Sequence, residues 1–207
     1  GILTKNRDGR PIKVEGNAEH PISKGGLCAV GQAMVLGLYD AQRLKQPSMN
    51  GTAADWTAVD EAVMQQLSQI QDGVYILTGT ITSPTTQAMI DRFLGQYRQS
   101  RHIVSDAVSY SAILGTHAQT HGTRVLPHYQ FDRAEVIVSL DADFLGTWIS
   151  PVEFTRAYMK RRTLADADPQ LSYHVQLEGR MSLTGSNADR RIQIAPGEVS
   201  GLLGRLA

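Results

Sequence analysis

The alternation of apolar segments after residue 55 constrains the fold of this chain more than any other feature of its sequence. Short apolar segments, typical of buried strands, alternate there with longer segments whose apolar residues recur at helical spacing. Such alternation is typical of a parallel sheet with helices on both faces. We therefore expect an α/β fold, a three-layer sandwich with a mostly parallel, Rossmann-like sheet. The expected strands are residues 74–78, 102–104, 136–140, 173–177 and 191–194, and the expected helices are residues 56–70, 84–97, 107–118, 151–162 and 196–206.

Capping signals precede three of these helices. Asp55 is a plausible N-cap of the first, and Ser83 followed by Pro84 marks the start of the second. Residues 150–153 read Ser-Pro-Val-Glu, the pattern of a capping box with proline at the first helical position. Each signal fixes where a connection ends and a helix begins.

The N-terminal part of the chain has a different character. Residues 1–6 and 11–15 flank the turn signal at residues 7–10, where Asp8 and Gly9 favour a tight β-hairpin. Glycine, proline, asparagine and serine recur up to residue 51, which predicts an irregular strap with one short helix within residues 29–38. We expect two regions: residues 1–50, the hairpin and strap, and residues 51–207, the Rossmann-like domain.

The chain begins inside a predicted strand, as a trimmed or processed piece of a longer protein would. We therefore treat the lack of an N-terminal targeting signal as uninformative. No apolar run reaches the roughly 20 residues of a membrane span. Twenty basic residues balance twenty acidic ones, which argues against a non-specific nucleic-acid binder.

The carboxyl ends of the predicted strands carry the candidate binding residues, because ligands of open parallel sheets lie beyond those ends. Thr80, Thr82 and Ser83 follow the first strand and lead into a helix N-terminus, where they could accept a phosphate. The alternative is an ordinary turn with a capping serine. Asp141 and Asp143 follow the third strand and could bind a hard cation or act in acid–base chemistry. The alternative is a solvated turn in which one aspartate caps backbone amides.

Other candidates for chemistry carry weaker signals. His117 and His121 are spaced to share a helix face, but no HExxH pattern or third metal ligand accompanies them. Ser109 and Ser111 lack a GxSxG signature. Cys28 is the single cysteine, so the chain cannot form an internal disulfide, a zinc ribbon or a four-cysteine iron–sulfur site by itself.

Residues 9–21 resemble the end of the N-terminal iron–sulfur domain of molybdopterin oxidoreductases. That family typically reads glycine, a strand and then E-G-[ND]-P-x-H-P, followed by a glycine and the last cluster-ligating cysteine. Residues 15–21 here read Glu-Gly-Asn-Ala-Glu-His-Pro, and residues 25–28 read Gly-Gly-Leu-Cys. The resemblance therefore implies that Cys28 occupies the position of the fourth cluster ligand, while the first three would precede the hairpin.

A narrower resemblance is to the large iron–sulfur subunit of alternative complex III, a quinol:electron-acceptor oxidoreductase. Proteins of this kind are often labelled iron–sulfur hydrogenase components. The resemblance covers nearly the whole chain and is specific through the order and spacing of its motifs. The residues that carry it are 37–40, 80–85, 131–146, 183–190 and 194–198.

The resemblance also implies a lost cofactor site. In the wider family, a G-x-N-type loop after the third strand contacts the pterin-dinucleotide cofactor, and residues 141–143 here read Asp-Ala-Asp. One carboxylate about 4 Å from a phosphate costs about 4 kcal/mol at an effective dielectric of about 20. Thr80, Thr82, Ser83, Asp141 and Asp143 would then mark a vestigial site. Ser109 or Ser111 lies near the metal-ligand position of the family.

These resemblances lead to two expectations about function. The first is a scaffold domain without its own cofactor, in a respiratory complex whose iron–sulfur clusters lie elsewhere in the parent protein. Its partners would be other subunits of that membrane-bound complex, on the periplasmic side of the bacterial inner membrane. The second is a domain of a genuine molybdenum enzyme that binds the bis-pterin-dinucleotide cofactor. The two aspartates favour the first, and molybdopterin is not expected here.

Overall fold

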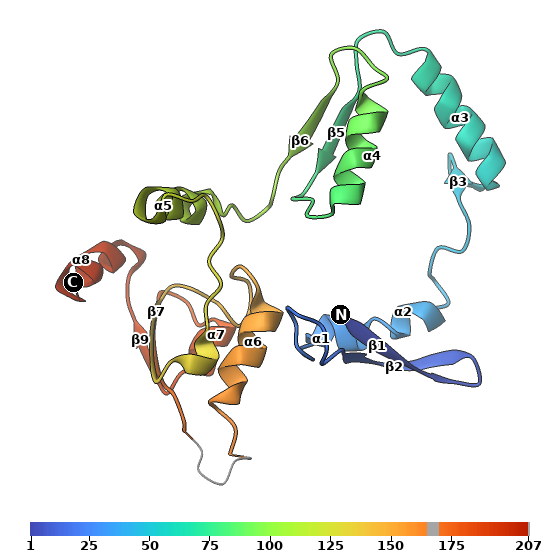
Figure 1. Ribbon diagram of the computed structural model, residues 1–207. Coiled ribbons are helices and arrows are strands. Elements are labelled where there is room, and N and C mark those ends of the chain that lie inside the picture. The colour runs from blue at the N-terminus through green and yellow to red at the C-terminus, as the bar shows by residue number, and fades with distance from the viewer. Residues whose placement is uncertain (165–169, 207) are drawn as a thin grey trace. The chain divides into compact units, whose positions relative to one another are not determined.

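The structure of the protein is a computed structural model that describes residues 1–164 and 170–206. The chain divides into two compact units (Figure 1). Unit 1 comprises Gly1–Asp40 and His117–Ala207, and unit 2 comprises Ala41–Thr116. In the described part of the chain, no helix is long and apolar enough to cross a membrane.

Unit 1 begins with the predicted hairpin, formed by β1 (Ile2–Arg7) and β2 (Arg10–Gly16) in antiparallel pairing. Asp8 and Gly9 both have positive φ, at 49° and 75°, as a two-residue turn that follows the twist of the strands requires. The predicted helix within residues 29–38 occurs as two short helices, α1 (Ala29–Ala33) and α2 (Leu36–Tyr39).

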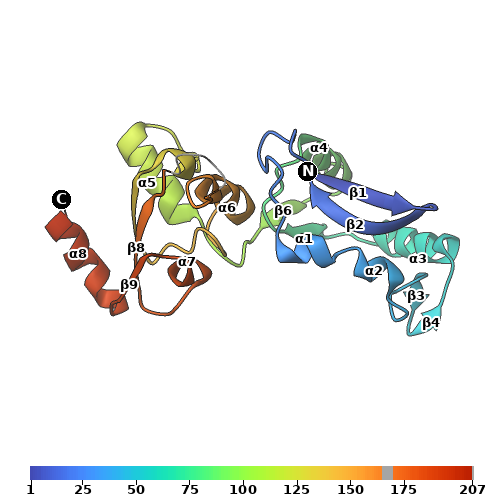
Figure 2. The ribbon, with the colours of Figure 1, turned by 90° about the horizontal axis from the view of Figure 1, so that it is seen from below.

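The rest of unit 1 is built on a three-stranded parallel sheet. Its strands β7 (Val136–Leu140), β8 (Tyr173–Glu178) and β9 (Arg190–Gln193) lie in that order, with Val138 opposite Val175 and Leu177 opposite Ile192. The accompanying elements, shown in Figures 1 and 2, are the single turns η1 (Phe131–Arg133) and η2 (Pro196–Glu198) and the helices α6 (Pro151–Lys160), α7 (Leu183–Ser186) and α8 (Val199–Leu206).

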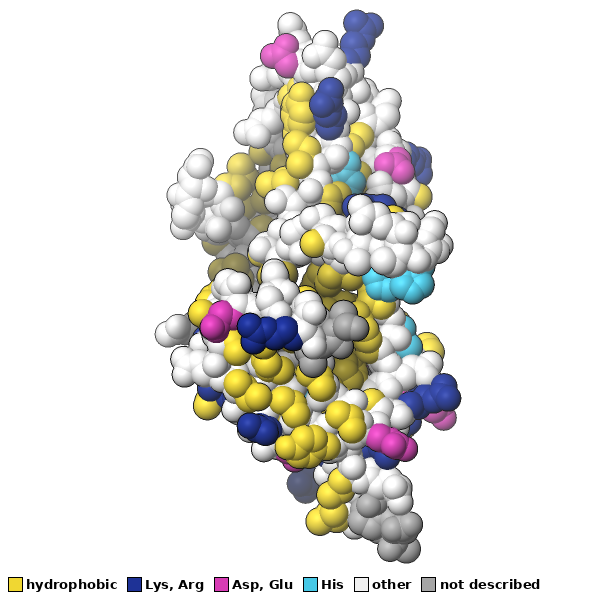
Figure 3. All heavy atoms as spheres, turned by 90° about the vertical axis from the view of Figure 1, so that its left-hand side faces the viewer, with side chains coloured by type: hydrophobic (Ala, Val, Ile, Leu, Met, Phe, Trp, Pro, Cys, Tyr) yellow, Lys and Arg dark blue, Asp and Glu magenta, His cyan; other side chains and the backbone are white. Residues whose placement is uncertain are grey.

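The core of unit 1 lies between this sheet and α6. Phe144 and Phe154 are each 1% exposed and Tyr158 is 2% exposed, and these three residues pack with Ile137 and Leu145. The opposite face of the sheet is apolar but open: Val136 and Val138 are exposed, and hydrophobic side chains gather on this side of the unit in Figure 3.

Unit 2 contains a second, two-stranded parallel sheet, formed by β5 (Tyr75–Thr78) and β6 (Arg101–Val104) and joined through α4 (Pro84–Leu94). Ahead of it lie the short hairpin of β3 (Ser48–Met49) and β4 (Thr52–Ala53) and the helix α3 (Trp56–Ser68). The Asp55 carboxylate caps α3 by accepting from the Ala58 N–H at 2.8 Å, as the sequence predicts. The helix α5 (Ser111–His121) crosses the boundary between the units.

The α/β class is therefore confirmed, with all five predicted strands present and pairing in parallel within their sheets. Within the described residues they form a pair and a triple in different units rather than one continuous sheet. The Rossmann-like arrangement stays a prediction. The expected division into two regions near residue 50 also stays a prediction. The two compact units are defined by contacts between residues, and they place the hairpin in the same unit as the C-terminal strands.

The predicted capping box at the start of α6 is wrong in one respect. The helix begins at Pro151 as expected, but the Ser150 side chain makes no capping hydrogen bond. The Glu153 carboxylate, the other half of the motif, instead pairs with the His128 ring at 2.8 Å. The Glu153 side chain, which the capping-box pattern assigns to the helix N-terminus, thus pairs with a residue outside the helix.

Candidate functional site

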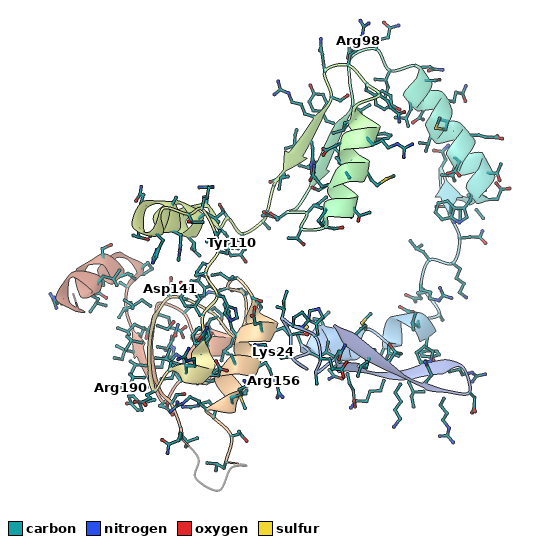
Figure 4. All side chains as sticks on the ribbon, viewed as in Figure 1. Lys24, Arg98, Tyr110, Asp141, Arg156 and Arg190 are labelled. Carbon is teal, nitrogen blue, oxygen red and sulfur yellow. The ribbon has the colours of Figure 1, made fainter. Side chains whose placement is uncertain are left out.

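The candidate binding edge of unit 1 lies at the carboxyl ends of its three parallel strands. Asp141 follows β7 with a φ of 52°, and its N–H donates to the Leu177 carbonyl at 2.7 Å. In Figure 4, Asp141 lies at one end of the sheet and Arg190, at the start of β9, lies at the other. A hollow of about 650 Å³ opens at the Asp141 end, lined by Asp141, Gly179, Arg180, Gln193, Ile194, Ala195 and Pro196.

Asp143 is half-buried and bonded within unit 1, although the sequence places it close to Asp141. Its carboxylate accepts from the Thr184 N–H at 3.1 Å and from the Thr184 hydroxyl at 2.8 Å, and also from the Thr147 hydroxyl at 3.2 Å. Thr184 is fully buried and its hydroxyl oxygen accepts from the Leu145 N–H at 2.9 Å. Asp143 therefore ties the loop after β7 to α7, in the capping role that is the alternative for this pair, and Asp141 is the aspartate of the pair that lines the hollow.

A row of buried polar side chains on β8 lies directly beneath this edge, and it was not anticipated from the sequence. His174 and Gln176 are fully buried and Glu178 is 1% exposed. Gln176 donates to the Glu178 carboxylate at 3.2 Å and lies 3.3 Å from His174 Nε2. The only sequence signal for this row is the alternation His-x-Gln-x-Glu within a predicted strand, since alternate residues of a strand share a face.

Glu178 is held at the carboxyl end of the row by three further donors. The Ser182 N–H and hydroxyl donate to it at 3.0 and 2.6 Å, and Arg191 Nε donates at 2.6 Å. Burial by itself raises the pKa of Glu178, but the hydrogen bonds from Ser182, Arg191 and Gln176 outweigh burial and hold that pKa below its ordinary value. The carboxylate is therefore charged and fully engaged within the protein, which leaves it no lone pair oriented toward a ligand.

His174 at the other end of the row meets a second ion pair. Its Nδ1 lies 3.2 Å from the Tyr158 hydroxyl, and its backbone N–H donates to Asp189 at 2.7 Å. Asp189 is held by both terminal nitrogens of Arg162, at 2.6 and 2.9 Å. Burial lowers the pKa of His174, whereas the hydrogen bond from Arg162 lowers the pKa of Asp189. His174 is thus neutral near pH 7, and the charges of Arg162, Asp189 and Glu178 act on its ring.

These shifts predict that unit 1 loses stability on acidification in two steps. The unfolded chain binds a proton at His174 near its ordinary pKa of 6.5, and the folded chain does so only at lower pH, so stability falls as pH drops below 6.5. Glu178 and Asp189 have lowered pKa values, so a second loss follows below about pH 4.5. Urea unfolding at a series of pH values should show both steps, and His174→Gln should remove the first. The exposed His121→Gln, as a control, should leave both; a first step that persists in His174→Gln would contradict the assignment.

The second set of candidate residues lies in unit 2, after β5. Thr80 donates its N–H at 2.8 Å and its hydroxyl at 2.5 Å to the Asp106 carboxylate, which follows β6, and these bonds lower the pKa of Asp106. The Ser83 hydroxyl accepts from the Thr86 N–H at 3.2 Å and caps α4. Thr82 lies in the same exposed turn. The hydroxyl groups of Thr80 and Ser83, two of the three expected to face a phosphate, are therefore hydrogen-bonded within the protein.

The histidine and serine candidates form local pairs. The rings of His117 and His121 stack with centroids 4.9 Å apart, and the Ser109 hydroxyl donates to that of Ser111 at 2.9 Å. Across the described residues, no group of three or more histidine, cysteine, aspartate or glutamate side chains is placed to hold a metal ion.

Cys28 is exposed and lies at the N-cap of α1, where its sulfur accepts from the Gly31 N–H at 3.4 Å. It lines an apolar groove of about 660 Å³ in unit 1, together with side chains that include Leu27, Leu145, Val152 and Met159. The thiol is therefore accessible at the position that the family resemblance gives to a cluster ligand.

Comparison with known proteins supports a molybdopterin oxidoreductase-like domain over nearly the whole chain, although no family model matches the sequence. The chain is 23% identical to "Menaquinone reductase, molybdopterin-binding-like subunit" of Nitratidesulfovibrio vulgaris, over 97% of this chain and 29% of that protein. It is 21% identical to "Nitrate reductase" of Klebsiella oxytoca, over 98% of this chain and 23% of that protein. It is also 20% identical to "F420-dependent formate dehydrogenase subunit alpha" of Methanocaldococcus jannaschii, over 95% of this chain and 29% of that protein. The chain thus spans less than a third of each relative.

Proposed function

We propose that this chain is a scaffold domain in the large iron–sulfur subunit of a quinol:electron-acceptor oxidoreductase of the alternative complex III kind. The domain holds neither a molybdopterin cofactor nor an iron–sulfur cluster of its own. The clusters of the parent protein lie in other regions, and the domain contributes structure by which redox subunits assemble. The sequence resemblance in residues 131–146 and 183–190 supports this particular subunit.

The observation that carries the proposal is the charge at the carboxyl ends of the unit 1 strands. A pyrophosphate placed in the hollow there would meet the Asp141 carboxylate, and Arg180 is the cation among the lining residues. One cation against one carboxylate leaves no excess positive charge for a doubly charged pyrophosphate. The Asp143 side chain supplies no donor in exchange, because a carboxylate only accepts and its oxygens already accept from Thr184. The residues at this edge therefore fit a pterin dinucleotide poorly.

The name of one relative also supports the scaffold proposal. The menaquinone reductase subunit is described as molybdopterin-binding-like, which links a domain of this kind to a quinone-linked complex. We infer by analogy that the partners of this chain are other subunits of a membrane-bound respiratory complex, on the periplasmic side of the bacterial inner membrane. Purification of the parent protein from membranes, with its associated subunits identified by mass spectrometry, tests both inferences.

A second function is favoured by two other relatives. The names nitrate reductase and formate dehydrogenase describe enzymes, and Arg180 could pair with one phosphate oxygen in the hollow. On this alternative the chain is part of a genuine molybdenum oxidoreductase that binds the bis-pterin-dinucleotide cofactor. Asp141 counts against it, since the carboxylate would have to turn away from the bound phosphate.

Metal analysis of the intact parent protein separates the two functions. We expect molybdenum far below one atom per chain, and stoichiometric molybdenum would overturn the scaffold proposal.

Calorimetric titration of the chain with guanosine diphosphate tests whether Asp141 is what prevents a nucleotide from binding. We expect no binding by the native chain and measurable binding by Asp141→Gly, a substitution that the positive φ of Asp141 accommodates. Tight binding by the native chain would contradict the repulsion by Asp141.

A further inference from the structure

The β1–β2 hairpin carries like charges directly opposite each other. The register pairs Lys5 with Lys13 and Arg7 with Arg10. Residues paired in this way project from the same face, and Lys5 and Arg7, two positions apart on β1, share that face as well. Like charges in cross-strand pairs destabilise a hairpin, so this ladder of four cations is unfavourable until something of opposite charge lies against it.

A β-bulge assists the formation of the ladder. The register shifts between Lys5 and Asn6, so that Ile12 is left without a direct partner and Arg10 comes opposite Arg7. Bulges re-aim side chains and are retained features of sheets rather than defects. The turn at Asp8 and Gly9 closes the hairpin immediately beyond this pair.

Few carboxylates of the hairpin offset these charges. Glu15 accepts from Lys13 Nζ at 2.7 Å, and Asp8 lies in the turn. The hydrogen bond and the charge of Lys13 lower the pKa of Glu15, and the charge of Lys5 contributes as well, which agrees with the three side chains sharing a face. Lys5, Arg7 and Arg10 remain exposed on a hairpin that extends outward from the rest of unit 1 (Figure 1).

The two edges of the hairpin differ. On β2, the Pro11 carbonyl accepts from the Tyr39 hydroxyl at 2.5 Å, and β2 contacts α1. In the described residues, β1 pairs with no strand other than β2, and every residue of β1 is exposed. The β1 edge therefore offers backbone N–H and C=O groups beside a row of cations, the combination by which a sheet edge binds an extended peptide.

We propose that the β1 edge is a docking site for an extended acidic segment of a partner protein. The segment pairs with β1 through its backbone, and carboxylates at alternate positions lie against Lys5 and Arg7. Backbone pairing supplies affinity that does not depend on sequence, and the cation ladder selects acidic partners. Lysine on an exposed edge also discourages self-association, which keeps the edge open for a segment of opposite charge. The proposal does not depend on the scaffold function.

The test uses the full chain and a fluorescent, end-capped peptide of eight residues that alternates glutamate with threonine. Fluorescence anisotropy should show saturable binding that weakens as salt rises. The double variant Lys5→Gln/Arg7→Gln should bind about tenfold more weakly, because it removes two exposed charge contacts. The matched control Arg98→Gln/Arg124→Gln removes two exposed cations outside the hairpin and should bind like the native chain.

A second probe separates strand pairing from simple charge attraction. The same peptide with N-methyl groups on alternate residues keeps its carboxylates but cannot complete the backbone pairing, and we expect it not to bind. Equal binding of both peptides would overturn the docking mode. Absence of binding by the first peptide would overturn the proposal. In that case, binding of phosphatidylglycerol vesicles or of a single-stranded oligonucleotide that is lost in Lys5→Gln/Arg7→Gln would show that the cations recognise a different ligand.

Discussion

Replacement of Phe144 by alanine is expected to lower the free energy of unfolding of unit 1 by about 4 kcal/mol, the range found for large aromatic residues in cores. Phe144 is 1% exposed and stacks on Phe131 with ring centroids 4.3 Å apart. It also meets Tyr158 edge-on at 5.7 Å and lies 5.4 Å from the His174 ring. Alanine would therefore leave a cavity bounded by three rings, and the row of polar groups behind them would lose its apolar cover.

The measurement is urea unfolding followed by the fluorescence of Trp148, which packs against this core. A Trp56→Phe background removes the other tryptophan, which is 69% exposed in α3. Phe144→Leu should lose about half as much, because it retains part of the volume. Leu203→Ala, at a position that is 51% exposed in α8, should change the free energy by less than about 0.5 kcal/mol. A Phe144→Ala loss no larger than that of Leu203→Ala would contradict this packing of the core.

The elements that sequence reasoning predicted are those whose signals are local. The strand at residues 136–140 occurs with those bounds because four of its five residues are apolar and the first three are β-branched. The turn at Asp8 and Gly9, and the caps at Asp55 and Ser83, follow equally from local chemistry. In each case the residue itself supplies the backbone conformation or the hydrogen bond that defines the element.

The features that sequence reasoning missed depend on tertiary partners. Asp141 and Asp143 differ by two positions and look alike in the sequence, yet Thr184, 41 residues away, engages only Asp143. His174 and Glu178 would be placed on a solvated face by their polarity. They are buried because Tyr158, Ser182 and Arg191 supply partners from other segments, and a strand pattern carries no information about those partners.

The same contrast holds for the assembly of the sheets. Apolar strands alternating with helices predicted parallel pairing, which the structure confirms in both units. An apolar pattern predicts that a strand is covered, but it does not indicate which strand lies beside it. The order of the strands could therefore not be derived from the sequence pattern. The exposed Val136 and Val138 show the consequence, because a strand that reads as buried on both faces is covered on one face of unit 1.

Substitution of Gly185 by alanine is expected to cost about 3 kcal/mol, although alanine is ordinarily favourable in a helix such as α7. A methyl group built on Gly185 would overlap the Glu178 carboxylate. That carboxylate cannot move aside without breaking its bonds to Ser182 and Arg191, which hold it at 2.6 Å each. The clash therefore forces a choice between displacing α7 and leaving a buried charge without its partners, and both are costly.

A double-mutant cycle tests this cause for Gly185→Ala directly. Glu178→Ala is destabilising by itself, because Arg191 loses its carboxylate, but it also removes the atoms that the new methyl group would meet. Gly185→Ala should then cost less than about 1 kcal/mol in the Glu178→Ala background, a coupling of about 2 kcal/mol. Gly204→Ala, at a helical glycine with open space around its Cα, should be neutral or stabilising by up to about 1 kcal/mol. Additive costs for Gly185→Ala and Glu178→Ala would show that the contact between residue 185 and the Glu178 carboxylate is not the cause of the loss.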